Sequence, residues 1–270
     1  MKSKILINVE KIEEIDDYRK AGITAFLFAL TDYTVGYANT YTISEIEKID
    51  VSNKYILINR LLECHDVDNL KKLLKQLKTI KGIVYEDIAV YRIVKELNLD
   101  IELIYFQNHF GTNSRSINFW LDRVDSMFLS NELTEEEIKD ILTKVNKDVC
   151  LNVFGYNQIM YSRRSLLTNW SREFNIPYKN NNILEEVCTK IKIRAIENKY
   201  GTVMYSENIF NGLKLLELDH LKYGYFNTTF ISHEDVMKVL NNEDNILNFD
   251  EGFLKKATIY KLKERSKHNG

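Results

Sequence analysis

The sequence predicts a TIM-like (β/α)8 barrel with a β-hairpin inserted before its last strand. Short apolar runs alternate with amphipathic segments, giving seven strand-then-helix repeats at spacings of roughly thirty residues or less. After the seventh repeat, apolar and polar residues alternate around a turn at Asn198–Gly201, which indicates a hairpin. A late apolar run would supply the eighth strand and close the barrel.

Each expected barrel strand is a short apolar run bounded by turn or helix signals. In chain order the strands are Lys4–Val9, Thr24–Leu30, Tyr55–Asn59, Ile83–Tyr85, Ile101–Tyr105, Met127–Leu129, Val149–Phe154 and Tyr225–Ile231. Gly155 is expected to end the seventh strand and start a turn.

Capping signals mark the expected helices. Ser44 with Glu47 and Thr134 with Glu137 have the spacing of capping boxes, and Asp66 is expected to open a helix. Residues 171–186 suggest an exposed loop, and Ser206 is expected to cap a helix over NIFNGLKLLELDHLK.

Two parts of the chain are predicted. Residues 1–240 form the barrel, including the hairpin at about 187–206. Residues 241–270 form a C-terminal extension with one short strand and a basic tail.

The composition excludes several classes of protein. Lys and Arg number 37 against 39 Asp and Glu, so no global positive field favours nucleic acid. Cys64, Cys150 and Cys188 lie far apart, which indicates neither a disulfide framework nor a thiolate metal site. No apolar run reaches the roughly twenty residues of a membrane span. The N-terminus MKSKILINVEK resembles a strand rather than a signal peptide, so cytoplasm is expected.

The functional groups of such a barrel lie where its strands end at the carboxyl face. The polar residues at these strand ends are Asn59, Arg60, Glu86, Asp87, Gln107, Asn108, His109, Asn131, Glu132 and Tyr161 to Arg164. We expect substrate to contact Asn59, Glu86, Asn108, Tyr161, Ser162 and Arg163.

Glu132 and Arg164 are the candidate catalytic residues. Adjacent Arg163 and Arg164 suit a carboxylate or phosphate, although one of them can instead satisfy loop carbonyls or a carboxylate. Glu132 is either a general base with a pKa raised by burial or the ion-pair partner of Arg164.

The other strand-end residues carry weaker signals. Glu86 and Asp87 could coordinate a hard cation; alternatively, Asp87 only caps the helix that follows it. His109 lacks a second nearby histidine, so no metal site is expected. No GxSxG or HExxH motif occurs, and Ser162 and Ser165 have no evident base.

Several segments together resemble the collagenase-like peptidase family of unknown catalytic type, peptidase family U32. They are GIVYEDIAVYRIVKELNLDIELIYFQNHFGTNS, FLSNELTEEEIKDI, VFGYNQIMYSRRSLLTN, ENKYGTVMYSENIFNGLKLLELDHL and DEGFLKKATIYKLKE. The resemblance covers nearly the whole chain and implies a TIM-like barrel, and the family name implies proteolysis. Other branches resemble proteins for tRNA uridine or rRNA cytidine hydroxylation, or for oxygen-independent quinone synthesis.

Many of these relatives are thought to hold an iron–sulfur cluster through cysteines, the first in a YSxRC-type turn. Ser165 stands at that position, so no cluster is expected here. Phe154 replaces a frequent His, and Asn131 with Glu132 replaces a common Arg–Glu pair. The eighth strand, YFNTTF, lacks the usual Lys and Glu.

The resemblance implies a cluster-less member that acts in tRNA uridine 5-hydroxylation with a longer cysteine-bearing paralogue. The alternatives are a genuine peptidase that cleaves collagen-like or unfolded polypeptide and a non-catalytic barrel whose mouth is plugged by side chains. RNA binding would use Tyr161–Arg164 with Trp170, Arg172 and the tail Lys255–Lys267, although a solvated basic C-terminus is the simpler explanation of that tail.

Overall fold

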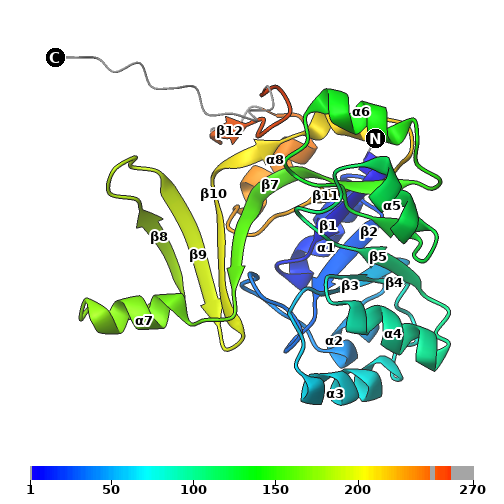
Figure 1. The fold of residues 1–270 in the computed structure, drawn as a ribbon, viewed down its shortest axis with the longest axis horizontal. Coiled ribbons are helices and arrows are strands. Elements are labelled where there is room, and N and C mark those ends of the chain that lie inside the picture. The colour runs from blue at the N-terminus through cyan, green and yellow to red at the C-terminus, as the bar shows by residue number, and fades with distance from the viewer. Residues whose placement is uncertain (1, 244–246, 257–270) are drawn as a thin grey trace.

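The computed structural model describes residues 2–243 and 247–256. Within these residues, eight parallel strands surround a common lumen (Figure 1). They are β1 Ile5–Asn8, β2 Ala25–Ala29, β3 Asn53–Ile58, β4 Gly82–Tyr85, β5 Glu102–Tyr105, β6 Ser126–Met127, the first part of β7 Val149–Ser162, and β11 Leu221–Phe226.

The barrel is closed. β1 pairs with β2 on one side and β11 on the other, and β11 pairs with β7. Between β6 and β7 a bridge joins Phe128 to Cys150, and the amide of Leu129 donates to the Cys150 carbonyl at 3.0 Å. The predicted (β/α)8 barrel is therefore confirmed, although its eighth strand spans Leu221–Phe226 rather than the predicted Tyr225–Ile231.

Helices cover the outside of the barrel (Figure 1). They are α1 Ile15–Lys20, α2 Ile43–Glu47, α3 Cys64–Leu74, α4 Ile88–Leu97, α5 Ser114–Leu121, α6 Glu135–Leu142 and α8 His233–Leu240, with short 3-10 turns η1 Lys2–Lys4, η2 Ile12–Glu14 and η3 Leu213–Glu217. A further helix, α7 Leu166–Glu173, lies away from the barrel. Asp66, expected to open a helix, occupies the third position of α3 and accepts the amide of Glu63 at 2.9 Å.

Two predicted helix caps are confirmed. At α6, the Glu137 carboxylate accepts the Thr134 amide at 2.8 Å, which completes the capping box. At α4, Asp87 accepts the amide of Ala89 at 2.9 Å, as the capping alternative for this carboxylate requires.

The capping box predicted at Ser44 and Glu47 is wrong. Thr42 and Glu45 form it, two residues earlier, because α2 begins at Ile43. Glu47 instead accepts the backbone amide of Thr79 at 3.0 Å and fastens the loop before β4.

Two apolar layers hold the barrel together. Side chains inside the lumen form one layer, and the larger layer fills the space between strands and helices. In the larger layer, the rings of Phe154 and Phe226 stack with centroids 4.1 Å apart, which joins β7, just before Gly155, to the end of β11.

Gly155 does not end the seventh strand. Its φ of +111° bends β7, and a Cβ there would lie 2.1 Å from the Asn227 carbonyl oxygen. Only glycine adopts this backbone beside β11 without strain, so the strand turns outward and continues to Ser162.

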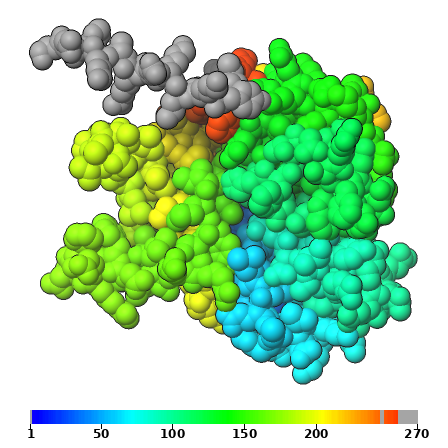
Figure 2. Space-filling model, in the orientation of Figure 1, coloured from blue at the N-terminus to red at the C-terminus, as the bar shows by residue number. Residues whose placement is uncertain are grey.

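An antiparallel sheet, called the outer sheet below, follows from this bend. It consists of the second half of β7, β10 Gly201–Asn211, β9 Lys192–Asn198 and β8 Asn181–Glu185. The outer sheet and α7 stand beside the barrel (Figures 1 and 2). The predicted hairpin, with its turn between Asn198 and Gly201, is confirmed.

Two local predictions around the hairpin are wrong. Residues 171–186 are not wholly loop, since α7 reaches Glu173 and β8 spans Asn181–Glu185. Ser206 caps no helix, because β10 continues to Asn211 and only η3 follows.

The C-terminal extension adds β12 Phe249–Asp250, which pairs with β10. The basic end beyond residue 256 lies outside the described residues. The boundary placed at residue 240 stays a prediction.

Candidate functional site

The carboxyl ends of the barrel strands present a polar layer. Lumen-facing residues of successive strands include Leu57, Val84, Phe106, Cys150 and Tyr225. Because strand side chains alternate, the residues two positions further on face the same way. These residues are Asn59, Glu86, Asn108, Asn152 and Asn227.

Two of the four amide side chains in this layer bind backbone groups of the chain around the mouth. Asn59 accepts the amide of Val35 at 3.0 Å and donates to its carbonyl at 3.1 Å. Asn227 donates to the carbonyl of Tyr156 at 3.1 Å. Since these buried amides are satisfied, they fix the loops at the barrel mouth.

A short chain of amides crosses the layer. Asn152 donates to Asn131, and Asn131 donates to Asn108 at 3.3 Å. Asn152 Oδ1 is left buried with no hydrogen-bond partner in the described part of the chain. It is an acceptor that a polar group entering the mouth would satisfy.

Glu86 is the acidic member of the layer. Its Oε1 is buried and has no hydrogen-bond partner among residues 2–243 and 247–256. Burial raises the pKa of Glu86 to about 8, so the carboxyl is neutral at neutral pH. A neutral buried carboxyl can donate a hydrogen bond or a proton.

Tyrosines fill the space above this layer. The hydroxyls of Tyr37 and Tyr225 lie 2.8 Å apart, and Tyr205, from β10, donates to the Gly36 carbonyl at 2.6 Å. The cavity between these rings and the amides has about 10 Å³ open to the centre of a water molecule. Since that is the space of a single water, the mouth is filled by the protein's own side chains.

The segment Tyr161–Arg164, called the arginine corner, lies on the outer rim of the barrel mouth. Arg163 forms an ion pair with Glu63, the N-cap residue of α3, and Tyr161 donates to the Tyr200 carbonyl at 3.1 Å. Ser162 Oγ accepts the amide of Arg164, whose side chain is exposed. The corner comes seven or more residues after Phe154 along β7, so it lies beyond the amide layer.

Beside Arg163 is a hollow of about 300 Å³ that also contains Arg60. The Arg60 guanidinium is buried, pairs with Asp66 and lies 3.9 Å from the centroid of the Tyr200 ring. These charges are already paired within the chain, which makes the hollow a poor site for a free anion.

Glu132 does not meet Arg164. Its carboxylate pairs with His109 Nδ1 at 3.3 Å, and the two side chains are 57% and 48% exposed. The expected Glu132–Arg164 pair is therefore wrong, because β7 carries the arginines past the mouth. The catalytic role of either residue stays a prediction.

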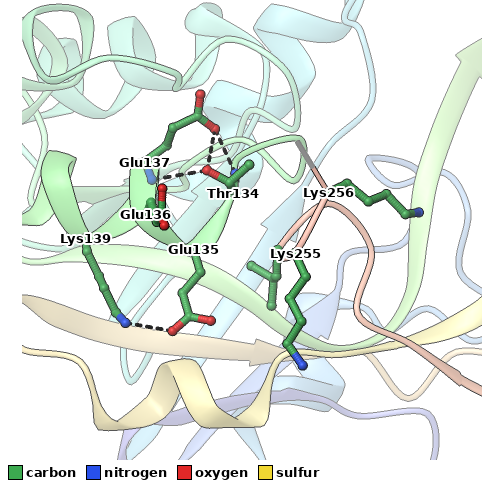
Figure 3. Close-up of a pocket in the computed structure, with 8 residues that line it drawn as sticks. Thr134, Glu135, Glu136, Glu137, Lys139, Lys255 and Lys256 are labelled. Carbon is green, nitrogen blue, oxygen red and sulfur yellow. Dashed lines mark hydrogen bonds and ion pairs between the residues drawn. The ribbon is translucent and has the colours of Figure 1, made fainter. Parts of the chain in front are cut away.

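A wider hollow of about 680 Å³ lies at the start of α6 (Figure 3). Its polar side chains bind one another: Thr134 is capped by Glu137, and Glu135 pairs with Lys139 at 2.7 Å and with Lys214 at 2.7 Å. These contacts stabilise the helix end and explain the cluster without a ligand.

The chain resembles known proteins across this architecture. Residues 34–204 match the profile of Peptidase family U32, which is more than half of the chain. The chain belongs to Peptidase family U32.

Two curated relatives of this U32 chain come from Bacillus subtilis (strain 168). tRNA hydroxylation protein P2 is 24% identical over 178 residues, covering 63% of this chain and 58% of P2. tRNA hydroxylation protein P1 is 24% identical over 172 residues, covering 60% of this chain and 40% of P1. The chain thus spans about half the length of the curated relatives that it matches.

Among solved structures, the U32 peptidase Mk0906 is similar at 12% identity and a TM-score of 0.49. The similarity covers 83% of this chain and 92% of that one.

Ser165 of this U32 chain lies at the N-cap of α7, where its side chain caps nothing. Glu197 of β9 caps the helix instead: it accepts the amides of Leu167 at 2.7 Å and Thr168 at 3.2 Å, and the hydroxyl of Thr202 at 2.7 Å. Despite desolvation, these hydrogen bonds hold the pKa of Glu197 below its usual value.

The residues around Ser165 do not fit an iron–sulfur cluster. Cys64 begins α3, Cys150 is buried in the barrel lumen and Cys188 lies in the turn after β8. In the described ranges no three His, Cys, Asp or Glu side chains gather as a metal site. No cluster chemistry is therefore assigned to this chain.

The predicted substrate-binding residues fall into two groups. Asn59, Glu86 and Asn108 lie at the mouth, whereas Tyr161, Ser162 and Arg163 lie on the rim. The sequence analysis did not predict the tyrosine plug, which consists of Tyr37, Tyr205 and Tyr225. These residues come from a loop, β10 and β11 and share no sequence motif.

None of the described helices is long and apolar enough to cross a membrane.

Proposed function

We propose that this U32 chain acts in the 5-hydroxylation of tRNA uridine, as the partner of a longer cysteine-bearing paralogue. The observation that carries the proposal is the match to both tRNA hydroxylation proteins P1 and P2 over about three fifths of the chain. The cytoplasm, where tRNA resides, is the compartment that this function requires.

A supporting role, rather than the chemical step, suits the barrel mouth. Tyr37, Tyr205 and Tyr225 leave space for a single water at the mouth, and Ser165 replaces the cysteine of the family turn. The longer paralogue would then supply the cluster and the reacting groups, while this chain holds the partner or the RNA.

Exposed apolar residues support a protein partner. Seven of the thirteen large exposed hydrophobic side chains in the described ranges fall between residues 159 and 191, a short part of the chain. Trp170 lies on α7, Phe174 directly after it, Ile183 on β8, and Val187 and Ile191 in the turn between β8 and β9. Exposed apolar side chains of this size are typical of contacts with another protein.

Deleting the gene in its source organism tests the proposal. Nucleoside mass spectrometry of purified tRNA should show loss of 5-hydroxyuridine and of nucleosides made from it. A plasmid copy of the wild-type gene should restore them. Unchanged 5-hydroxyuridine in the deletion strain would rule the proposal out.

A further inference from the structure

A hollow of about 830 Å³, called the α7 hollow, lies where α7 meets the outer sheet. Its wall is formed by the first turn of α7, the connector of residues 178–181 and the turn between β9 and β10. It is separate from the filled barrel mouth, and it is wide enough for a nucleotide.

Two lysines give the α7 hollow its charge. Lys179 is exposed and forms no ion pair within the described residues, and the Lys199 side chain is 68% exposed, with Asp32 at 2.8 Å. The acid of the hollow, Glu197, is 4% exposed, and its oxygens are taken up by α7 and Thr202. Lys179 therefore contributes to the solvent-facing surface of the hollow a positive charge that is unpaired in the described ranges, and Lys199 contributes a second charge that it shares with Asp32.

The segment around the α7 hollow is basic, although the chain as a whole has no excess of basic residues. Residues 159–200 contain eight Lys and Arg against four Asp and Glu, whereas the whole chain has 37 against 39. Lys179 and Lys199 are the two of these cations that line the α7 hollow, and the excess of positive charge in the segment attracts a polyanion to this part of the molecule.

Tyr178 provides an aromatic surface in the same hollow. Its side chain is 50% exposed. Burial, and then the charge of Glu197, raise the pKa of Tyr178, and both residues line the α7 hollow. An anchored ring with an open face is suited to stacking on a base, and the amides of Asn180 and Asn181 lie beside it.

We propose that the α7 hollow binds a nucleotide from a single-stranded segment of tRNA. Lys179 and Lys199 contact its phosphate, and Tyr178 stacks on its base. The proposal rests on the proposed function and adds the site at which the RNA is held.

RNA suits this hollow better than a protein does. The large exposed aliphatic side chains of β8 and of the turn that follows it, Ile183, Val187 and Ile191, are outside its lining, which is polar apart from the Tyr178 ring. A protein partner on those aliphatic residues would leave the hollow open.

The test is fluorescence anisotropy of a labelled, unmodified tRNA transcript with the full chain. Lys179→Glu with Lys199→Glu should weaken binding at least about tenfold and lower the slope of log affinity against log salt by about 1.4. Lys72→Glu with Lys75→Glu, two exposed lysines at the far end of α3, makes the same charge change and should alter affinity less than about twofold.

Tyrosine variants separate stacking from charge. Tyr178→Ala should weaken binding several-fold without changing the salt slope, and Tyr178→Phe should retain most of the affinity. Circular dichroism and thermal unfolding of every variant should match the wild type, so that loss of binding reports the hollow.

Two results would overturn the proposal. One is an equal loss in the α3 control, and the other is normal tRNA binding by the Lys179, Lys199 and Tyr178 variants. If those variants bind tRNA but no longer co-purify with the longer paralogue, the hollow is a protein site. A deletion strain that keeps its 5-hydroxyuridine refutes the proposed function alone, because the binding data stand separately.

Discussion

Replacing Glu86 with Gln should remove a pH dependence of stability. The ordinary pKa of 4.5 applies in the unfolded chain, and burial raises the folded value to about 8. Between these values the folded protein keeps a proton that the unfolded chain has released, so stability falls as pH rises. Each pH unit costs about 1.4 kcal/mol, which amounts to up to about 3 kcal/mol between about pH 5 and pH 7.5.

Urea unfolding followed by circular dichroism measures this effect. The free energy of unfolding of the Glu86→Gln protein should exceed that of the wild type by a margin that grows with pH through this window. Glu132→Gln, at an exposed carboxylate paired with His109, should run parallel to the wild type. Parallel curves for Glu86→Gln as well would refute the assignment of a neutral, buried Glu86.

Three further outcomes follow from the packing. Gly155→Ala should cost on the order of 3 kcal/mol in urea unfolding, because its Cβ would meet the Asn227 carbonyl, while Gly22→Ala, which has a positive φ but would make only ordinary contacts with the Lys2 side chain, should cost about 1 kcal/mol. Glu197→Ala should leave the start of α7 uncapped, cost about 1–3 kcal/mol and speed amide exchange in α7 but not in α4. The purified wild type should leave gelatin intact on a gel, with or without chelator, because its mouth holds one water; fragments that disappear with Glu132→Gln or Arg164→Ala would contradict this.

The barrel could be predicted because its signals are local. Each strand is a short apolar run, and the polar residue after it faces the mouth by simple alternation. Asn59, Glu86 and Asn108 were found in this way. Their positions at the mouth follow from strand geometry, whereas a role in substrate binding stays a prediction.

The errors arose where a distant contact decides the local structure. Gly155 looks like a strand end in sequence, but its fit against Asn227 lets β7 bend and continue. The run after Ser206 has apolar residues at helical spacing, yet pairing with β7 keeps it extended as far as Asn211. The displacement of Arg164 from Glu132 follows from the first of these errors.

The tyrosine plug could not be deduced from spacing. Tyr37 comes from the loop after β2, and Tyr205 lies 168 positions later on β10. Only the closed barrel and the bend of β7 bring these two rings together. The number of tyrosines, sixteen in the chain, was the one available signal, and it does not indicate where they gather.

β7 is one uninterrupted strand that serves two sheets, and β10 runs alongside it on both sides of the bend. The barrel and the outer sheet are therefore connected by a continuous strand and not by a flexible linker. Because Tyr205 lies on β10, which pairs with β7, we expect a partner that twists the outer sheet to displace Tyr205 at the barrel mouth as well.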